Sequence, residues 1–156
     1  NALTYKEIFT LIKANKIWTG VRGFSGGMWF ESNYEGKTEK IITDNNGESV
    51  KIINVPSIWF TNLDHKKRHE KLILYKNYTP EEYPKYDNYD AIEVKKTAEI
   101  PMDYDGVMGV PITFLDKYNP EQFEILGLDV HRVQWRGRGP EINGKCVYRR
   151  IIIKKK

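Results

Sequence analysis

The Asn143–Gly144 pair constrains the fold of this chain more than any other local feature. An Asn-Gly pair suits a two-residue turn in which both central residues need positive φ. Residues 146–153, which follow it, are therefore predicted to form the return strand of a β-hairpin. The three lysines at residues 154–156 are expected to form a solvated tail.

One amphipathic helix is predicted near the beginning of the sequence. Thr4 can act as the N-cap, and Glu7 follows three residues later, which is a capping box. Apolar residues then recur with helical spacing, and the helix is expected to end near Asn15. The apolar face consists of Tyr5, Ile8, Phe9 and Ile12.

The rest of the sequence favours short strands, so the predicted fold class is α/β with a mostly β C-terminal region. The expected strands cover residues 17–22, 28–30, 50–55, 57–63, 72–75, 91–94 and 123–130. The polar stretch 31–50, with Asn45-Asn46-Gly47 as a turn signal, is predicted to be a variable or mobile insertion. Residues 78–89, rich in Tyr and Pro, indicate an ordered loop held by packed rings.

Composition narrows the class of protein. A length of 156 residues is enough for a real core, and a net charge of +4 with a pI of about 9.0 is compatible with a polyanionic partner. A single cysteine, Cys146, excludes an internal disulfide and favours a reducing, cytoplasmic location.

No apolar run is long enough for a membrane helix and no leader is recognised. The chain opens without Met, so we expect a piece of a longer protein.

The densest internal basic cluster, Lys66-Lys67-Arg68, is the first candidate for contact with DNA phosphates. The alternative is a solvated loop. A second candidate is the glycine-containing stretch around Arg136 and Arg138, because arginine can read guanine in the major groove. An exposed loop is equally compatible with that stretch.

Lys145 on the predicted hairpin could extend the same face. Arg149 and Arg150 point to opposite sides if they lie on a strand, so at most one of them can face DNA. His65 and His69 have a spacing that could bind a metal on a helix, but no third ligand is evident. No metal site is therefore predicted.

Two long stretches, residues 57–68 and 104–123, resemble the C-terminal half of the EcoRI-type adenine-specific DNA methyltransferases. The opening residues 1–9 and the hairpin at 142–145 fit the same family. The resemblance implies a parent enzyme of a restriction-modification system, which transfers a methyl group from S-adenosylmethionine to adenine N6 in double-stranded DNA. The target base must leave the helical stack to be reached.

The resemblance also implies a division of the chain. Residues 1–75 would form the C-terminal edge of a Rossmann-like methyltransferase sheet, with a variable insertion near 23–56. Residues 76–156 would form a mostly β region that faces DNA. In this interpretation the strands near 17–22 and 57–63 are the last two of the sheet.

The sequence departs from the family pattern in one decisive respect. It contains no Pro-Pro dipeptide, so the family's adenine-binding Asn-Pro-Pro-Phe motif is absent, and Gly137-Arg138-Gly139 precedes Pro140 and a hairpin rather than a helix. No catalytic or cofactor-binding residue is therefore predicted. The chain alone is expected to bind S-adenosylmethionine weakly or not at all, to need an N-terminal remainder for activity, and to self-associate through an open sheet edge.

A different class of function stays open from the sequence alone, namely a standalone nucleic-acid-binding module without catalytic activity. An Asn-Pro-Pro-Phe motif encoded in frame upstream of Asn1 would favour the enzyme, and a start codon there would favour the module. A purely structural or protein-binding domain would show no salt-dependent affinity for DNA.

Overall fold

The computed structural model describes residues 5–24, 26–129 and 139–156. The chain divides into two compact units. One unit consists of Asn1–Trp18 and Asn62–Lys156, and the other consists of Thr19–Thr61. The described part is mostly sheet with one α-helix and short 3₁₀ turns, which agrees with the α/β class.

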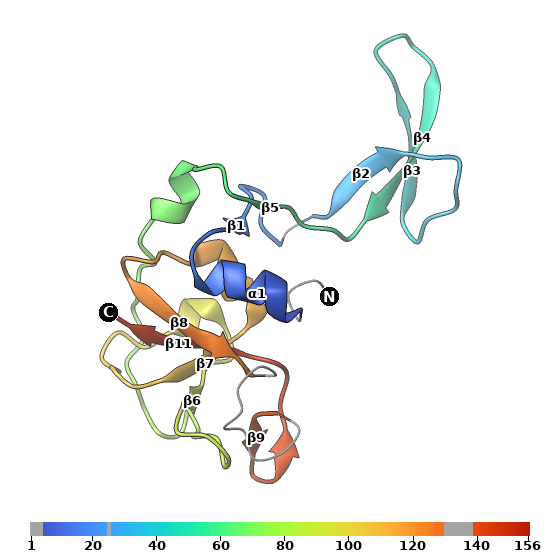
Figure 1. Ribbon diagram of the computed structural model, residues 1–156. Coiled ribbons are helices and arrows are strands. Elements are labelled where there is room, and N and C mark those ends of the chain that lie inside the picture. The colour runs from blue at the N-terminus through green and yellow to red at the C-terminus, as the bar shows by residue number, and fades with distance from the viewer. Residues whose placement is uncertain (1–4, 25, 130–138) are drawn as a thin grey trace. The chain divides into compact units, whose positions relative to one another are not determined.

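A four-stranded sheet forms the centre of the first unit (Figure 1). In spatial order its strands are β6 (Ile92–Glu93), β7 (Met108–Val110), β11 (Ile151–Lys155) and β8 (Phe123–Leu128). Strand β11 is antiparallel to both of its neighbours, and β6 is parallel to β7. The predicted strands at 91–94 and 123–130 are thus confirmed in shortened form. The single return strand predicted over 146–153 is wrong, because the chain leaves the sheet at residues 147–150 and β11 pairs with β7 and β8 instead of the hairpin.

Strand β11 is the centre of the core. Its residues Ile151, Ile152 and Ile153 are all buried, as expected for a central strand that is covered on both faces. The predicted solvated tail is wrong, because Lys154 and Lys155 continue this strand and Lys155 donates a hydrogen bond to the Met102 carbonyl. A strand with partners on both sides extends further than its apolar residues alone indicate.

Helix α1 (Lys6–Lys13) lies beside β8 in the first unit. Phe9 and Ile12 are buried on its inner face, whereas Tyr5 is exposed, so the predicted apolar face is confirmed only in part. Its N-cap is Tyr5, which makes no side-chain capping bond, and the proposed cap Thr4 lies outside the described residues. The helix ends before Asn15, which has a positive φ of 54°.

Short 3₁₀ turns and a small hairpin also belong to the described part of the first unit. The turns are η2 (Lys66–His69), η3 (Thr97–Glu99) and η4 (Ile112–Lys117). The hairpin pairs β9 (Glu141–Ile142) with β10 (Lys145–Cys146). Its turn residues Asn143 and Gly144 have φ of 51° and 71°, so the predicted two-residue turn is confirmed.

The tyrosine-rich segment is ordered by buried rings, as the sequence predicted. Tyr83 and Tyr86 are both buried, and the Tyr83 hydroxyl donates a 2.7 Å hydrogen bond to the Glu99 carbonyl. No strand forms over residues 72–75, where the sequence had indicated one. That segment is instead held by Gln122, whose side chain exchanges two 2.8 Å hydrogen bonds with the backbone of Leu72.

The second unit is a three-stranded antiparallel sheet in the order β2–β4–β3. Its strands are β2 (Met28–Glu31), β3 (Glu39–Thr43) and β4 (Ser49–Val55). The chain enters and leaves this unit through β1 (Trp18–Thr19) and β5 (Phe60–Thr61), which pair with each other. The strands predicted at 17–22 and 57–63 are therefore reduced to two residues each.

The stretch 31–50 contains one whole strand and the start of another. Asp44 Oδ1 accepts hydrogen bonds from the backbone of Asn46 and Glu48 at 2.8 and 2.9 Å, which forms the predicted turn. Strand β3 was not predicted from the sequence, because all five of its residues are exposed and its polar and apolar residues do not alternate. Its pairing with β4, rather than its own pattern, makes it a strand.

The close approach of Tyr86 to the backbone of β7 gives a test of the core. A Cβ added at Gly109 would lie 2.1 Å from the Tyr86 hydroxyl oxygen, so Gly109→Ala forces the ring to move. We expect a loss of about 1–3 kcal/mol in the free energy of unfolding, measured by urea denaturation.

The matched control is Gly20→Ala, whose Cβ would have its nearest contact at 3.5 Å from Trp59 Cβ. That variant should change stability by no more than about 0.5 kcal/mol. Equal stability of the two variants would show that Tyr86 does not occupy the space beside Gly109.

Candidate nucleic-acid interface

The basic cluster predicted from the sequence forms the short 3₁₀ turn η2. The turn is closed by backbone hydrogen bonds from Arg68 N–H to the His65 carbonyl and from Glu70 N–H to the Lys67 carbonyl, at 3.3 and 3.4 Å. Lys66 is exposed and Lys67 is half-buried. A turn this tight sends successive side chains in different directions, so the three cations do not share one role.

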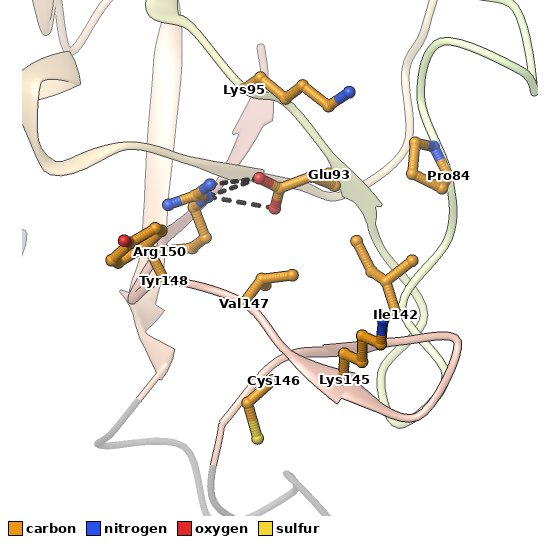
Figure 2. A pocket seen from close by; sticks show the side chains of 9 residues that line it. All are labelled: Pro84, Glu93, Lys95, Ile142, Lys145, Cys146, Val147, Tyr148 and Arg150. Atoms are coloured by element: carbon orange, nitrogen blue, oxygen red, sulfur yellow. Dashed lines mark hydrogen bonds and ion pairs between the residues drawn. The ribbon is translucent and has the colours of Figure 1, made fainter.

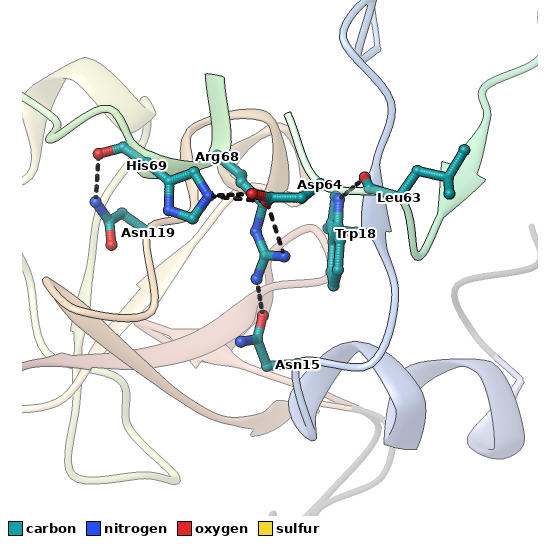
Figure 3. A network of polar contacts seen from close by, with 7 residues as sticks. All are labelled: Asn15, Trp18, Leu63, Asp64, Arg68, His69 and Asn119. Atoms are coloured by element: carbon teal, nitrogen blue, oxygen red, sulfur yellow. Dashed lines mark hydrogen bonds and ion pairs between the residues drawn. The ribbon is translucent and has the colours of Figure 1, made fainter. Parts of the chain in front are cut away.

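The side chain of Arg68 is held by contacts with other residues of the protein (Figure 3). Its Nη2 donates a 2.8 Å hydrogen bond to Asn15 Oδ1, and its Nη1 lies 3.4 Å from Asp64 Oδ1. Its guanidinium carbon lies 3.3 Å from the centre of the Trp18 ring, which is a cation–π contact. With only 12% of the side chain exposed, Arg68 fixes the position of η2.

A second set of bonds holds the far end of the turn. His69 Nε2 lies 2.8 and 3.0 Å from the two carboxylate oxygens of Asp64, and this hydrogen bond is the main cause that lowers the pKa of Asp64. The His69 carbonyl accepts a 3.0 Å hydrogen bond from Asn119 Nδ2. His69 thus binds a carboxylate. Among the residues that the structure describes, no group of three or more possible ligands could hold a metal.

A groove of about 260 Å³ lies next to η2. Three of the residues that line it are lysines, namely Lys67, Lys71 and Lys117, and one, Glu70, is acidic. Lys71 and Lys117 were not predicted as site residues. They are 46 positions apart in the sequence, and only the packing of η4 (Ile112–Lys117) against η2 brings them together. An excess of ammonium groups along a groove is the pattern that phosphate contact requires.

A larger cleft of about 730 Å³ lies between β6 and the β9–β10 hairpin (Figure 2). Lys145, the remaining predicted contact in the described part, lines this cleft and not the groove beside η2. Arg136 and Arg138 lie outside the described residues. The structure therefore places the described candidates at two separate sites.

A buried ion pair forms the floor of the cleft. Arg150 Nε donates to both carboxylate oxygens of Glu93 at 2.9 and 3.1 Å, and its Nη2 donates to Glu93 Oε1. The Tyr86 hydroxyl donates to Glu93 Oε2. Burial, followed by the charge of Glu93, raises the pKa of Tyr86 far above its ordinary range, so Tyr86 keeps its proton and acts as a donor.

Arg149 and Arg150 precede strand β11 and do not lie on a strand, but their side chains differ in burial. Arg150 is buried in the ion pair, and Arg149 is exposed. Cys146 is exposed and lines the cleft. Neither the buried pair nor the role of Arg68 was recognised from the sequence, because Glu93 is 57 positions from Arg150 and Asn15 is 53 positions from Arg68.

Comparison with known proteins identifies the protein family to which the chain belongs. The family model described as the adenine-specific methyltransferase EcoRI matches residues 1–156. The chain belongs to this family of EcoRI-type adenine-specific methyltransferases, as the resemblance indicated.

Individual relatives agree with this assignment. The chain is 51% identical over 165 residues to the type II methyltransferase M.EcoRI of Escherichia coli, covering 100% of this chain and 48% of the relative. It is 40% identical over 177 residues to M.MgeORF184P of Mycoplasma genitalium, covering 99% and 54%. For M.MpnI of Mycoplasma pneumoniae the identity is 35% over 173 residues, again covering 99% and 54%.

The chain thus spans about half the length of the curated relatives it matches. No solved structure gives a significant match. No helix in the described part of the chain is long and apolar enough to cross a membrane.

The different positions of Lys66 and Arg68 predict different effects of removing them. Arg68→Ala removes a partly buried ion pair, a hydrogen bond and a ring contact, so we expect a loss of about 2 kcal/mol in the free energy of unfolding. Lys66→Ala removes an exposed side chain and should change it by less than about 0.5 kcal/mol. Urea denaturation measures both.

Arg68→Lys adds a control for charge alone. A lysine keeps the charge but lacks the planar fork that reaches Asn15 and Asp64 together, so this variant should recover little of the lost stability. Full recovery by lysine, or a wild-type stability of Arg68→Ala, would rule out the positioning role.

Proposed function

We propose that this chain is the DNA-contacting half of an adenine-specific type II DNA methyltransferase. The observation that carries the proposal is the family match over the whole chain, combined with a lysine-lined groove beside η2. The lysines supply the charge that neutralises phosphates of double-stranded DNA, and the parent enzyme methylates adenine N6 within a restriction-modification system. Phosphate contacts of this kind position the protein on DNA without reading its sequence.

The groove assigns distinct roles to the candidate residues in this proposal. Lys67, Lys71 and Lys117 line the groove and contact phosphates, and Arg68 holds η2 in place for them. Lys66, exposed on the same turn, adds a contact outside the groove. Arg136 and Arg138 remain candidates for contact with bases. Residues 76–156 supply the DNA-facing region, and residues 1–75 complete the edge of a Rossmann-like sheet through β1 and β5. This division follows the family resemblance and not the compact units.

The methyl donor does not fit the residues of this chain. S-adenosylmethionine requires a glycine-rich turn between a strand and a helix, whereas Gly139 leads through Pro140 into strand β9. The chain also contains no Pro-Pro dipeptide that could belong to the adenine-binding motif. We therefore assign cofactor binding and methyl transfer to the part of the parent enzyme that this chain does not span, and self-association of the isolated chain stays a prediction.

Duplex DNA binding over a salt series tests the groove. The logarithm of the binding constant should fall linearly with the logarithm of the salt concentration. Lys67→Ala and Lys71→Ala should each weaken binding and reduce the slope by about 0.9, because each removes one phosphate contact. Lys85→Ala serves as the control, since Lys85 pairs with Asp90 and lines neither the groove nor the cleft.

If Lys67→Ala and Lys71→Ala behave like Lys85→Ala, the groove is not the phosphate-binding surface. If the wild-type chain binds duplex DNA with no salt dependence, the DNA-contacting role is lost altogether.

A methylation assay tests the assignment of methyl transfer to the part of the parent enzyme that this chain does not span. The 156-residue chain, incubated with duplex DNA and S-adenosylmethionine, should transfer no methyl group above background. The full-length relative M.EcoRI provides the positive control under the same conditions. Turnover by the shorter chain would contradict the assignment of the chemistry to the missing half.

A further inference from the structure

We infer that the cleft between β6 and the β9–β10 hairpin binds a single unpaired nucleotide, with its phosphate paired to Lys95 and its base against Tyr148. The inference rests on the proposed function for the source of such a nucleotide, a DNA strand. It adds a second site with a different ligand chemistry from the phosphate groove beside η2.

The charge of the cleft favours an anionic ligand. Lys95, Lys145 and Arg150 line it together with one carboxylate, Glu93, so three positive charges face one negative charge. Arg150 and Glu93 neutralise each other at the floor, which leaves the two ammonium groups. Figure 2 shows Lys95 and Lys145 on opposite sides of the cleft, Lys95 after β6 and Lys145 on β10. Either ammonium group by itself can pair with a phosphate.

The floor of the cleft offers hydrogen-bond donors rather than acceptors. Both oxygens of Glu93 already accept bonds, from Arg150 and from Tyr86. Nη1 of Arg150 makes one described hydrogen bond, to the Arg149 carbonyl at 3.3 Å, and carries a second N–H. A buried ion pair is costly to desolvate, and charged groups buried under a cleft are frequent at binding sites. The ring nitrogens and carbonyl groups of bases are suitable acceptors.

The rim carries an exposed aromatic ring. Tyr148 is 86% exposed, the largest exposure among the large hydrophobic side chains in the described part of the chain. Val147 follows on the same segment, and Ile142 adds an apolar side chain on the opposite side of the cleft. An exposed ring beside apolar side chains is the arrangement on which unpaired bases stack. The volume of about 730 Å³ is within the range of sites for small organic ligands.

Cys146 gives a direct readout, because it lines the cleft and is the chain's single cysteine. N-ethylmaleimide is uncharged, so it does not compete for the lysines. Adenosine 5′-monophosphate and the single strand dA4 should each slow alkylation of the 156-residue chain saturably, whereas inorganic phosphate and adenosine should do so only at much higher concentration.

Variants separate the two contacts. Tyr148→Ala should weaken protection by both probes by about 5- to 150-fold, which corresponds to stacking worth about 1–3 kcal/mol. Tyr148→Phe should retain protection, because the ring remains. Lys95→Ala should weaken the protection of Cys146 by the nucleotide but leave the protection by adenosine unchanged. Tyr34→Ala, at an exposed tyrosine that does not line the cleft, is the matched control and should match wild type.

The two probes also identify the source of the nucleotide. Tighter protection by dA4 than by the mononucleotide supports a DNA strand, and the reverse supports a free nucleotide. The inference is overturned if neither probe protects Cys146, if phosphate protects as well as the nucleotide, or if Tyr148→Ala behaves like Tyr34→Ala.

Duplex binding distinguishes this inference from the proposed function. Salt-dependent duplex binding without protection of Cys146 would remove only the nucleotide site. Protection of Cys146 in a chain that does not bind duplex DNA would remove only the proposed function.

Discussion

The buried ion pair between Glu93 and Arg150 is the interaction on which the first unit depends. It links β6 to the segment leading into β11, on either side of β7, and it forms the floor of the large cleft. Removing either partner would leave an uncompensated charge in the core, which costs about 3–5 kcal/mol. Tyr86 completes the pair, and it reaches Glu93 only because Gly109 has no side chain.

The basic turn illustrates how one arginine can serve the lysines around it. The Arg68 side chain is mostly shielded from solvent, because it bonds Asn15 and Asp64 and packs on the Trp18 ring. Because the turn is fixed in this way, Lys67 lies in the same groove as Lys71 and Lys117. A cluster of three adjacent cations therefore divides into a partly buried, bonded Arg68, a groove-lining Lys67 and an exposed Lys66, which a sequence cannot separate.

Local chemistry explains what could be predicted from the sequence. The Asn143–Gly144 turn requires positive φ at both positions, and the helical spacing of Phe9 and Ile12 marks a buried face, so both features were recognised. Strand β3 and the pair Glu93–Arg150 depend on partners distant in the sequence, so no local pattern reveals them. The family was recognisable because its motifs are long, whereas the groove lysines required the packing of η4 against η2.

The central claim is that a DNA duplex lies against the groove beside η2. Lysine acetylation of the chain, with and without duplex DNA and read by mass spectrometry, tests this most directly. The account predicts that DNA protects Lys66, Lys67, Lys71 and Lys117 while Lys85 reacts at an unchanged rate. Uniform protection of all lysines, or protection that spares the groove, would contradict it.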